Sequence, residues 1–426
     1  MFNILGKMDG YCDGISRRTA LSIGAAGIGG MMLPDLLRAE NAAGIRGSNK
    51  ALINVYLGGG PSHQDMWDLK PNAPSEYRGE FTPIKTNVPG MEICEHFPML
   101  ARMADKFAVV RSTVGTVDDH SSFHTQAGYA KRDLQLVGGR PALGSVVAKL
   151  KGQTETGAPS FVSYMGDVSP GFLGAIHRPY RPDGPGRDNL RLSKEMSADR
   201  LANRAELRAK LGHLRAEADA SGEMNAVDGF TSRAVEVVTS GRLADALDAE
   251  KESKSVRDRY GSDGNKNFLL ARRLVEAGVR VVTFSWGGWD THGQNFVTLR
   301  KQLPKLDQGL SALIQDLSDR SMLNDVMIVV WGEFGRTPRI NKDAGRDHWS
   351  KVMSTFLAGG GLKTGQMVGT TDRYAGEADD RPVHLREIFA TLYRHFGIDA
   401  KNTTIQDTAG RPQYLVDARD PVKELI

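Results

Sequence analysis

Cysteine is nearly absent from this sequence, which excludes a fold built on disulfides. Only Cys12 and Cys94 occur in 426 residues, and Cys12 lies within the first 44 residues, which have the layout of a signal segment. A chain without that segment would keep one cysteine and could form no internal disulfide. No paired CxxC spacing of the kind that diagnoses a structural zinc site is present. We therefore expect Cys94 to be a small buried hydrophobe.

An excess of charge of one sign is also missing. The 55 basic and 51 acidic residues leave a net charge of +4, which gives no reason to expect nucleic acid as a partner. Internal repeats and low-complexity tracts are absent as well. With 40% hydrophobic and 25% charged residues, the chain can bury a large core. Its length fits one large α/β domain or two ordinary domains.

The apolar segment near the N-terminus is too short to favour a membrane span. Arg17 and Arg18 precede an apolar, glycine-rich run of about 14 residues, whereas about 20 residues cross a bilayer. This layout predicts a twin-arginine export signal over residues 1–44, with the twin-arginine machinery as a partner. The protein would then be periplasmic or secreted, and would contact the membrane only if the signal stayed uncleaved. Proteins exported by this route fold first and often carry a cofactor.

Alternating strand and helix signals predict an α/β fold over residues 45–426. Apolar runs typical of buried strands lie at residues 51–57, 107–111, 159–164, 279–285 and 326–331, with a further candidate at 354–357. Helices are expected over residues 97–104, 140–150 and 385–396. Leucines spaced three and four apart between Leu299 and Leu317 predict a crossover helix that Pro304 kinks without ending. Such a crossover requires parallel flanking strands. Residues 184–264 are predicted to be a helical insertion or cap.

Acidic and histidine residues follow four of these strands. They are His63, Asp65 and Asp68; Asp119, His120 and His124; Asp290 and His292; and Glu333, Asp347 and His348. Because the carboxyl ends of parallel strands meet at one edge of a sheet, these groups are predicted to converge there. Mixed carboxylate and imidazole ligands suit zinc, manganese or iron, and a carboxylate-rich site suits magnesium or calcium. The alternative for the first two loops is a turn or helix cap that binds nothing.

A metal beside a hydroxyl and an arginine favours hydrolysis of a phosphate or sulfate ester. The metal would polarise an ester oxygen and activate a water or serine nucleophile. A helix beginning near Ser121 would offer free N–H groups to an anion. Arg336 would either clamp that anion in bidentate fashion or form a structural ion pair with Glu333.

Four motifs occur in an order that one family shares. They are GGGPSHQDMWDLKP from Gly58, RPALGS from Arg140, GGWDTH from Gly287 and GEFGRTP from Gly332. As a set they resemble an exported bacterial family, domain of unknown function 1501, which is similar to the alkaline phosphatase and sulfatase superfamily. The resemblance spans residues 51–397. It implies a three-layer α/β/α fold with a mostly parallel central sheet, like that of alkaline phosphatase, and metals at the carboxyl edge.

The resemblance also implies roles for individual residues. Asp290 and His292 match the Asp and His pair of one metal site, and His348 matches its later third ligand. Glu333 stands where the superfamily has the Asp of an Asp-His-Gly motif. Phe334 replaces the histidine of that motif, which argues against a full second metal.

Two further positions depart from the superfamily pattern. A glycine, Gly58 or Gly59, stands where the first strand would end in a ligand Asp, so that Asp65 or Asp68 would have to substitute. Ser121 and Ser122 are the nearby nucleophile candidates. Neither lies in a sulfatase-type Cys-x-Pro-x-Arg motif, so a formylglycine mechanism is not expected.

These features lead to competing hypotheses for function. The first is an exported metal-dependent hydrolase of phosphate or sulfate esters, using zinc, manganese, magnesium or calcium and acting on an anionic ester such as a sulfated or phosphorylated glycan. The main alternative is a non-catalytic periplasmic protein of the same fold that binds an anionic glycan or a protein partner. The altered catalytic positions favour this alternative. A third is a metal-dependent transferase acting on cell-envelope or polysaccharide substrates.

Overall fold

The computed structural model describes residues 50–131, 133, 138–154, 156–184, 190, 203, 241–261, 263–417 and 419–426. The predicted export signal at residues 1–44 and most of the predicted insertion at residues 184–264 lie outside these ranges. Within the described end of that insertion, two helices form, α9 (Arg242–Ala246) and α10 (Lys254–Tyr260).

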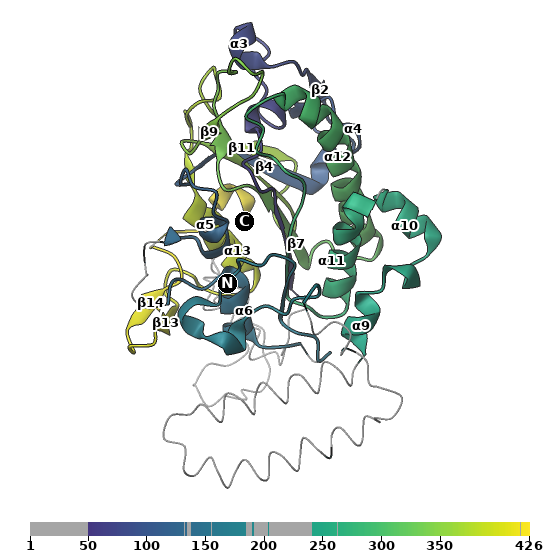
Figure 1. The fold of residues 1–426 in the computed structure, drawn as a ribbon, viewed down its shortest axis with the longest axis vertical. Helices are drawn as coiled ribbons and strands as arrows, with labels where there is room; N and C mark the ends of the chain where they lie inside the picture. Colours follow the sequence, from purple (N-terminus) through teal and green to yellow (C-terminus); the bar gives the residue numbers. More distant parts are fainter. Residues whose placement is uncertain are drawn as a thin grey trace, which may run out of the picture.

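A mixed, mostly parallel sheet of eight strands forms the centre of the described fold (Figure 1). The strands are β1 (Ala51–Tyr56), β4 (Phe107–Val114), β5 (Phe161–Ser163), β6 (Val281–Ser285), β7 (Val326–Trp331), β10 (Met353–Gly359), β11 (Gln366–Val368) and β12 (Val383–His384). Their order is β11-β4-β10-β7-β1-β6-β5, and β12 also pairs with β4. Only β10 runs antiparallel to its neighbours, β4 and β7. The predicted α/β fold with a mostly parallel sheet is therefore confirmed.

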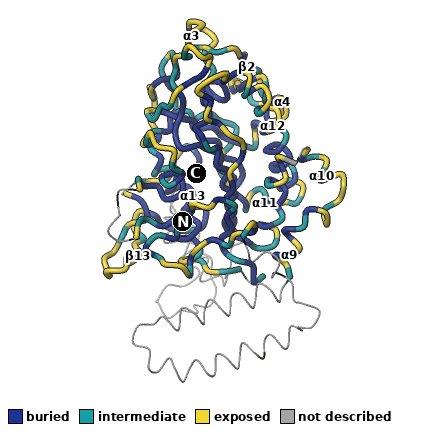
Figure 2. Tube along the Cα trace, in the orientation of Figure 1, coloured by how far each residue is buried: buried dark blue, intermediate teal, exposed yellow. Residues whose placement is uncertain are grey.

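Helices cover both faces of this sheet and create three layers (Figure 1). On one face lie α11 (Lys266–Glu276) and α12 (Asn295–Asp319), and on the other lie α6 (Leu143–Lys151) and α13 (Leu385–His395). Side chains alternate along β1, because Ile53 and Val55 join the apolar cluster of α11 and α12, whereas Leu52 and Tyr56 join that of α6 and α13. Figure 2 shows these strands as the buried centre of the molecule.

The predicted crossover helix is α12, which connects β6 to β7. Its leucines from Leu299 to Leu317 are fully buried, and complete burial of one such side chain contributes about 1.5 to 3 kcal/mol. The helix continues through Pro304. Because β1 pairs in parallel with both β6 and β7, the loops that follow these three strands leave the sheet side by side.

Shorter elements complete the described fold. They are α3 (Ser75–Arg78), α4 (Pro98–Ala101), α5 (Phe123–Ala127) and three strand pairs, β2 (Pro83–Lys85) with β3 (Glu92–Cys94), β8 (Gly335–Arg336) with β9 (His348–Trp349), and β13 (Thr404–Gln406) with β14 (Pro412–Tyr414). The helix predicted over residues 97–104 is the shorter α4, and the one predicted near Ser121 begins at Phe123. Cys94 is free and buried, as expected.

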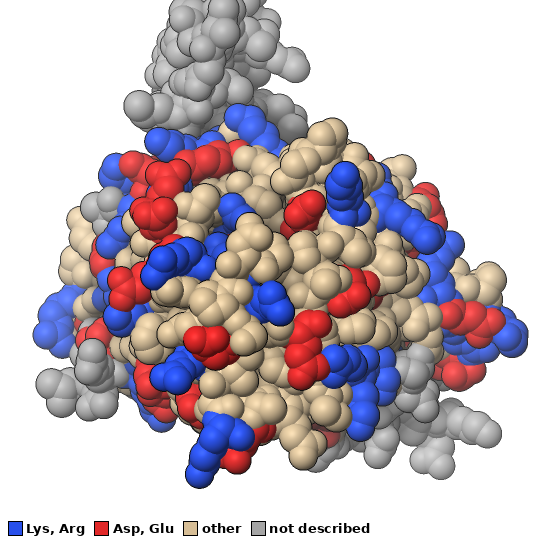
Figure 3. Space-filling model, turned by 90° about the horizontal axis from the view of Figure 1, so that it is seen from above, with Lys and Arg blue, Asp and Glu red and all other residues tan. Residues whose placement is uncertain are grey.

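Two properties of the surface bear on partners. In the described part of the chain, no helix combines the length and apolar character needed to cross a bilayer. Figure 3 shows lysine and arginine side chains interspersed with aspartate and glutamate on the face seen from above. On that face, the two signs of charge mix without one sign dominating.

Candidate metal centre

Four side chains converge at the carboxyl edge of the central sheet, namely His120, Asp290, His292 and His348. Each offers one ligand atom, and these atoms all lie within 4.8 Å of one another. His120 comes from the loop after β4, Asp290 and His292 from the loop after β6, and His348 from β9. The four side chains are 24% to 49% exposed, so a small molecule from solvent can reach them.

The ligand atoms in this group are three imidazole nitrogens and the oxygens of one carboxylate. The Nε2 atom of His292 lies 3.0 Å from Nε2 of His348 and 3.0 Å from Oδ1 of Asp290. The Nε2 atom of His348 lies 3.3 Å from the same oxygen. The Nε2 atom of His120 lies 3.5 Å from Oδ2 of Asp290. All three Nε2 atoms therefore point toward one small volume.

A carboxylate faces the other ring nitrogen of each histidine. Nδ1 lies 2.7 Å from Asp347 in His292, 3.1 Å from Asp118 in His348 and 2.9 Å from Glu333 in His120. An ionised carboxylate only accepts hydrogen bonds, so a proton on each Nδ1 satisfies the carboxylate that it faces, and that tautomer leaves Nε2 available to bind a metal. The hydrogen bond from His292 also lowers the pKa of Asp347.

This arrangement fits a bound cation. The Nε2 atoms of His292 and His348 lie 3.0 Å apart and both face Asp290, an approach that a proton or a metal ion between them would stabilise. Zinc binds nitrogen at about 2.0 to 2.1 Å, which places tetrahedral ligand atoms about 3.3 Å apart. Four of the separations here are 3.0 to 3.5 Å, and all lie within 4.8 Å. Histidines that pair with carboxylates through the second nitrogen are the usual outer shell of such a site. Three nitrogens and one carboxylate suit zinc better than magnesium or calcium.

Arg336 fixes the carboxylate of this group. Its buried guanidinium donates from Nη2 to Oδ1 of Asp290 at 2.6 Å. Burial raises the pKa of Asp290, but the hydrogen bond and charge of Arg336, together with His292, outweigh burial and hold that pKa below its ordinary value. Other N–H groups of Arg336 bond to the backbone carbonyls of Gly60, Arg346 and Gly59. The structure therefore pairs Arg336 with Asp290 rather than with Glu333, and a role of Arg336 in binding an anion stays a prediction.

Asp65 and Asp68 lie apart from the four-residue group, in buried ion pairs. Asp65 accepts hydrogen bonds from Nε and Nη2 of Arg346, at 2.8 and 3.0 Å. Asp68 pairs with Lys70 at 3.1 Å and with Arg111 at 3.5 Å. The structure thus does not bring Asp65 or Asp68 to the metal centre, because neighbouring cations already neutralise both carboxylates. Arg346, which has no recognisable sequence signal, is the partner that sequence reasoning missed.

The two serines predicted as nucleophiles form local hydrogen bonds. The hydroxyl of Ser121 accepts the Phe123 N–H at 3.3 Å. The buried hydroxyl of Ser122 donates to Asp167 at 2.5 Å. Among the described interactions, neither hydroxyl contacts the four candidate ligands. The structure therefore does not single out either serine as the reacting group.

Glu333 lies beside the candidate centre but is not one of the four converging residues. Its side chain is buried, and its Oε1 atom accepts from Nδ1 of His120. Phe334, the next residue, packs against His120 and His348, with ring centroids 5.2 and 4.4 Å apart. This ring forms an apolar wall beside two of the candidate ligands.

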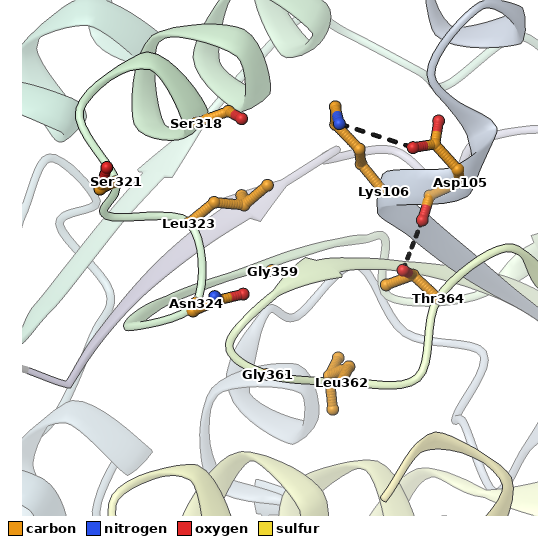
Figure 4. Close-up of a pocket in the computed structure, with 10 residues that line it drawn as sticks. All are labelled: Asp105, Lys106, Ser318, Ser321, Leu323, Asn324, Gly359, Gly361, Leu362 and Thr364. Atoms are coloured by element: carbon orange, nitrogen blue, oxygen red, sulfur yellow. Dashed lines mark hydrogen bonds and ion pairs between the residues drawn. The ribbon is translucent and has the colours of Figure 1, made fainter.

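A separate polar hollow of about 440 Å³ lies at the opposite edge of the sheet (Figure 4). Asp105 and Lys106, which form an ion pair there at 3.5 Å, directly precede β4. Asn324 precedes β7 by a similar distance in the chain. None of the described lining residues is a histidine. This hollow does not share the ligand chemistry of the carboxyl edge.

The fold and site together define an α/β protein with a candidate metal centre at the carboxyl edge of a mostly parallel sheet. The sequence model of the family described as Protein of unknown function (DUF1501) matches residues 49–426, and the chain belongs to that family, as predicted. No curated protein matches its sequence. Among solved structures, the PsFucS1 sulfatase from Pseudoalteromonas sp. is similar, with 10% identity and a TM-score of 0.37 over 91% of this chain and 76% of that one.

Proposed function

We propose that this protein is an exported metal-dependent hydrolase of phosphate or sulfate esters, with one metal site made by His120, Asp290, His292 and His348. The observation that carries the proposal is the convergence of three Nε2 atoms, each on a ring whose Nδ1 faces a carboxylate. This arrangement favours zinc, with manganese or iron as alternatives. The proposal of export rests separately on Arg17 and Arg18.

The chain's own groups would prepare this site for chemistry. The carboxylates of Asp118, Asp347 and Glu333 fix the tautomer and direction of the three imidazoles, and Arg336 keeps Asp290 ionised. When bound, a divalent metal polarises an ester oxygen and lowers the pKa of a water. The exposure of the ligands leaves one side open for substrate.

The charge around the site makes substrate binding depend on the metal. Four carboxylates surround it, from Asp118, Asp290, Asp347 and Glu333, and within the described residues only Arg336 forms an arginine or lysine ion pair with any of them. Because Arg336 is buried and bonded, an anionic ester meets net negative charge unless a cation is bound. We therefore expect no measurable affinity for phosphate or sulfate esters after chelation.

The alternative of a non-catalytic protein has one specific observation in its favour. Four protein ligands can close a tetrahedral site, which is the pattern of structural zinc, whereas catalytic zinc usually has three protein ligands and an open position. A closed site would hold together the loops after β4, β6 and β7. The protein would then bind an anionic glycan or a protein partner without hydrolysing it.

Metal analysis followed by an activity screen tests the proposal. Protein expressed with added zinc is expected to hold metal, and His292→Ala and Asp290→Ala are expected to lose most of it. His96→Ala is the matched control, since that ring packs on Phe81 away from the centre. Less than a tenth of an equivalent in the unmutated protein would refute the metal site. Bound metal without turnover of any aryl phosphate or aryl sulfate would favour the binding protein.

A further inference from the structure

The loop after β1 packs closely between the loops that follow β6 and β7. Gly59 and Gly60 have φ of 111° and 75°, values that residues with a side chain rarely adopt. A Cβ at Gly59 would lie 2.3 Å from the backbone nitrogen of Asp290, and one at Gly60 would lie 2.5 Å from the ring of Phe334. Glycine is therefore required at both positions for the loops to approach this closely.

Two buried side chains clamp this glycine loop from opposite sides. The N–H groups of Gly59 and Gly60 donate to the Glu333 carboxylate at 2.8 and 3.2 Å. The carbonyls of the same two residues accept from Arg336, through Nη2 at Gly59 and through Nε at Gly60, the latter at 2.8 Å. All polar groups of the Gly59 and Gly60 peptides are thus used by Glu333 and Arg336.

Glu333 and Arg336, the two clamp residues, each also form a hydrogen bond with one candidate ligand. Glu333 accepts from Nδ1 of His120 at 2.9 Å, and Arg336 donates to Asp290 at 2.6 Å. Glu333 is 1% exposed and Arg336 is 0% exposed. The positions of His120 and Asp290 are therefore fixed through one buried network that includes the glycine loop.

The Glu333 carboxylate is occupied by protein donors rather than left free for a metal. A carboxylate offers about four lone-pair sites. Three of these receive the two glycine N–H groups and the His120 N–H, and the Tyr56 hydroxyl interacts with the same carboxylate. Burial first, and then the charge and hydrogen bond of Glu333, raise the pKa of Tyr56 far above its ordinary value, which keeps that hydroxyl protonated as a donor. Coordination by Glu333 would leave buried donors without partners.

We infer that the centre holds one metal ion per chain, and that Glu333 and Arg336 are positioning residues that act through His120 and Asp290. Glu333 is then not a metal ligand, although its position in the sequence suggested that role. The inference rests on the proposed function for the metal itself. It adds the number of metal ions. It also assigns a role to the GGGP and GEFGR motifs, which together form one hydrogen-bonded network that positions two of the ligands.

Metal stoichiometry separates this inference from the proposed function. Protein loaded with excess zinc and then freed of unbound metal is expected to retain one equivalent per chain. Two equivalents would overturn the single-ion inference and leave the metal-dependent hydrolase standing. Less than a tenth of an equivalent would overturn both.

The Glu333→Gln variant tests positioning directly. Glutamine keeps the volume of Glu333 but places an N–H₂ group against a donor, so we expect zinc affinity, measured by chelator competition, to fall about 10- to 100-fold with stoichiometry still at one. The visible absorption bands of bound cobalt(II) should persist, because the ligands are unchanged. Glu377→Gln, at an exposed carboxylate paired with Lys351, is the control. Unchanged affinity, or bands that report a changed ligand set, would overturn the inference. Should Glu333→Gln fail to fold, Arg336→Lys in the same assays serves as the second variant.

Discussion

The replacement of Asp65 by asparagine separates a structural ion pair from a metal ligand. In the structure Asp65 neutralises Arg346, whose side chain is fully buried and receives no other negative charge from the described ion pairs. Asparagine keeps the shape but leaves the guanidinium buried without a counter-charge. Removal of one partner of a buried pair costs about 3 to 5 kcal/mol. We expect Asp65→Asn to lower the free energy of unfolding by that amount while the folded protein still binds one equivalent of metal.

Urea unfolding followed by circular dichroism measures this loss, with metal content determined on the folded variant at low temperature. Asp325→Asn is the matched control, because its pair with Lys50 at 2.8 Å is partly exposed and such pairs contribute about 0 to 1 kcal/mol. An Asp65→Asn protein that loses its metal yet unfolds like the unmutated protein would refute the assignment. Asp65 would then be a ligand, as the sequence suggested.

Three further predictions concern the glycine loop, the carboxylate of Asp347 that faces His292, and the dependence of stability on pH. Gly59→Ala should destabilise the fold by more than about 2 kcal/mol and weaken metal binding, since its φ and contacts exclude a Cβ; Gly58→Ala, measured beside it by urea unfolding, should cost less. Asp347→Asn should weaken zinc binding about 10- to 100-fold in chelator competition because it frees the ring of His292, whereas Asp343→Asn in the same loop should not. Burial lowers the pKa of His395 to about 4, so the unfolded chain binds more protons between pH 6.5 and 4 and stability should fall by about 3 kcal/mol as pH drops through that window. An unfolding free energy that stays flat there would contradict this.

The central sheet could be predicted from the sequence for a physical reason. Parallel strands that are buried on both faces appear as continuous apolar runs, and the leucine spacing of α12 joins two of them. The antiparallel direction of β10 could not be predicted, because an apolar run does not indicate in which direction the strand runs. The two-residue pair of β8 and β9, which presents His348, is too short to show any periodicity.

The candidate site could be predicted from the sequence only in part. The strands predict which loops lie close together, but they do not show which side chains of those loops face the metal centre. His120, Asp290, His292 and His348 were all predicted as ligands and are brought together. Asp65 looked equally suitable, since its partner Arg346 lies 281 positions away in the chain. The pairing of Asp118 with His348 was missed because neighbouring Asp119 and Asp118 are indistinguishable without the loop conformation.

Strand β1, near the centre of the sheet, supplies none of the four candidate ligands. It contributes to the site by setting the distance between the loops on either side of it. Because β1 pairs with both β6 and β7, the loop after it must pass between the loops that carry Asp290 and Glu333. A side chain at Gly59 would push against the backbone of Asp290, and bare peptide groups there can bond to both clamp residues at once. The positions of His120 and Asp290 are therefore linked through the backbone of Gly59 and Gly60. Because Gly59 has no side chain, Glu333 and Arg336 can both bond to its peptide groups.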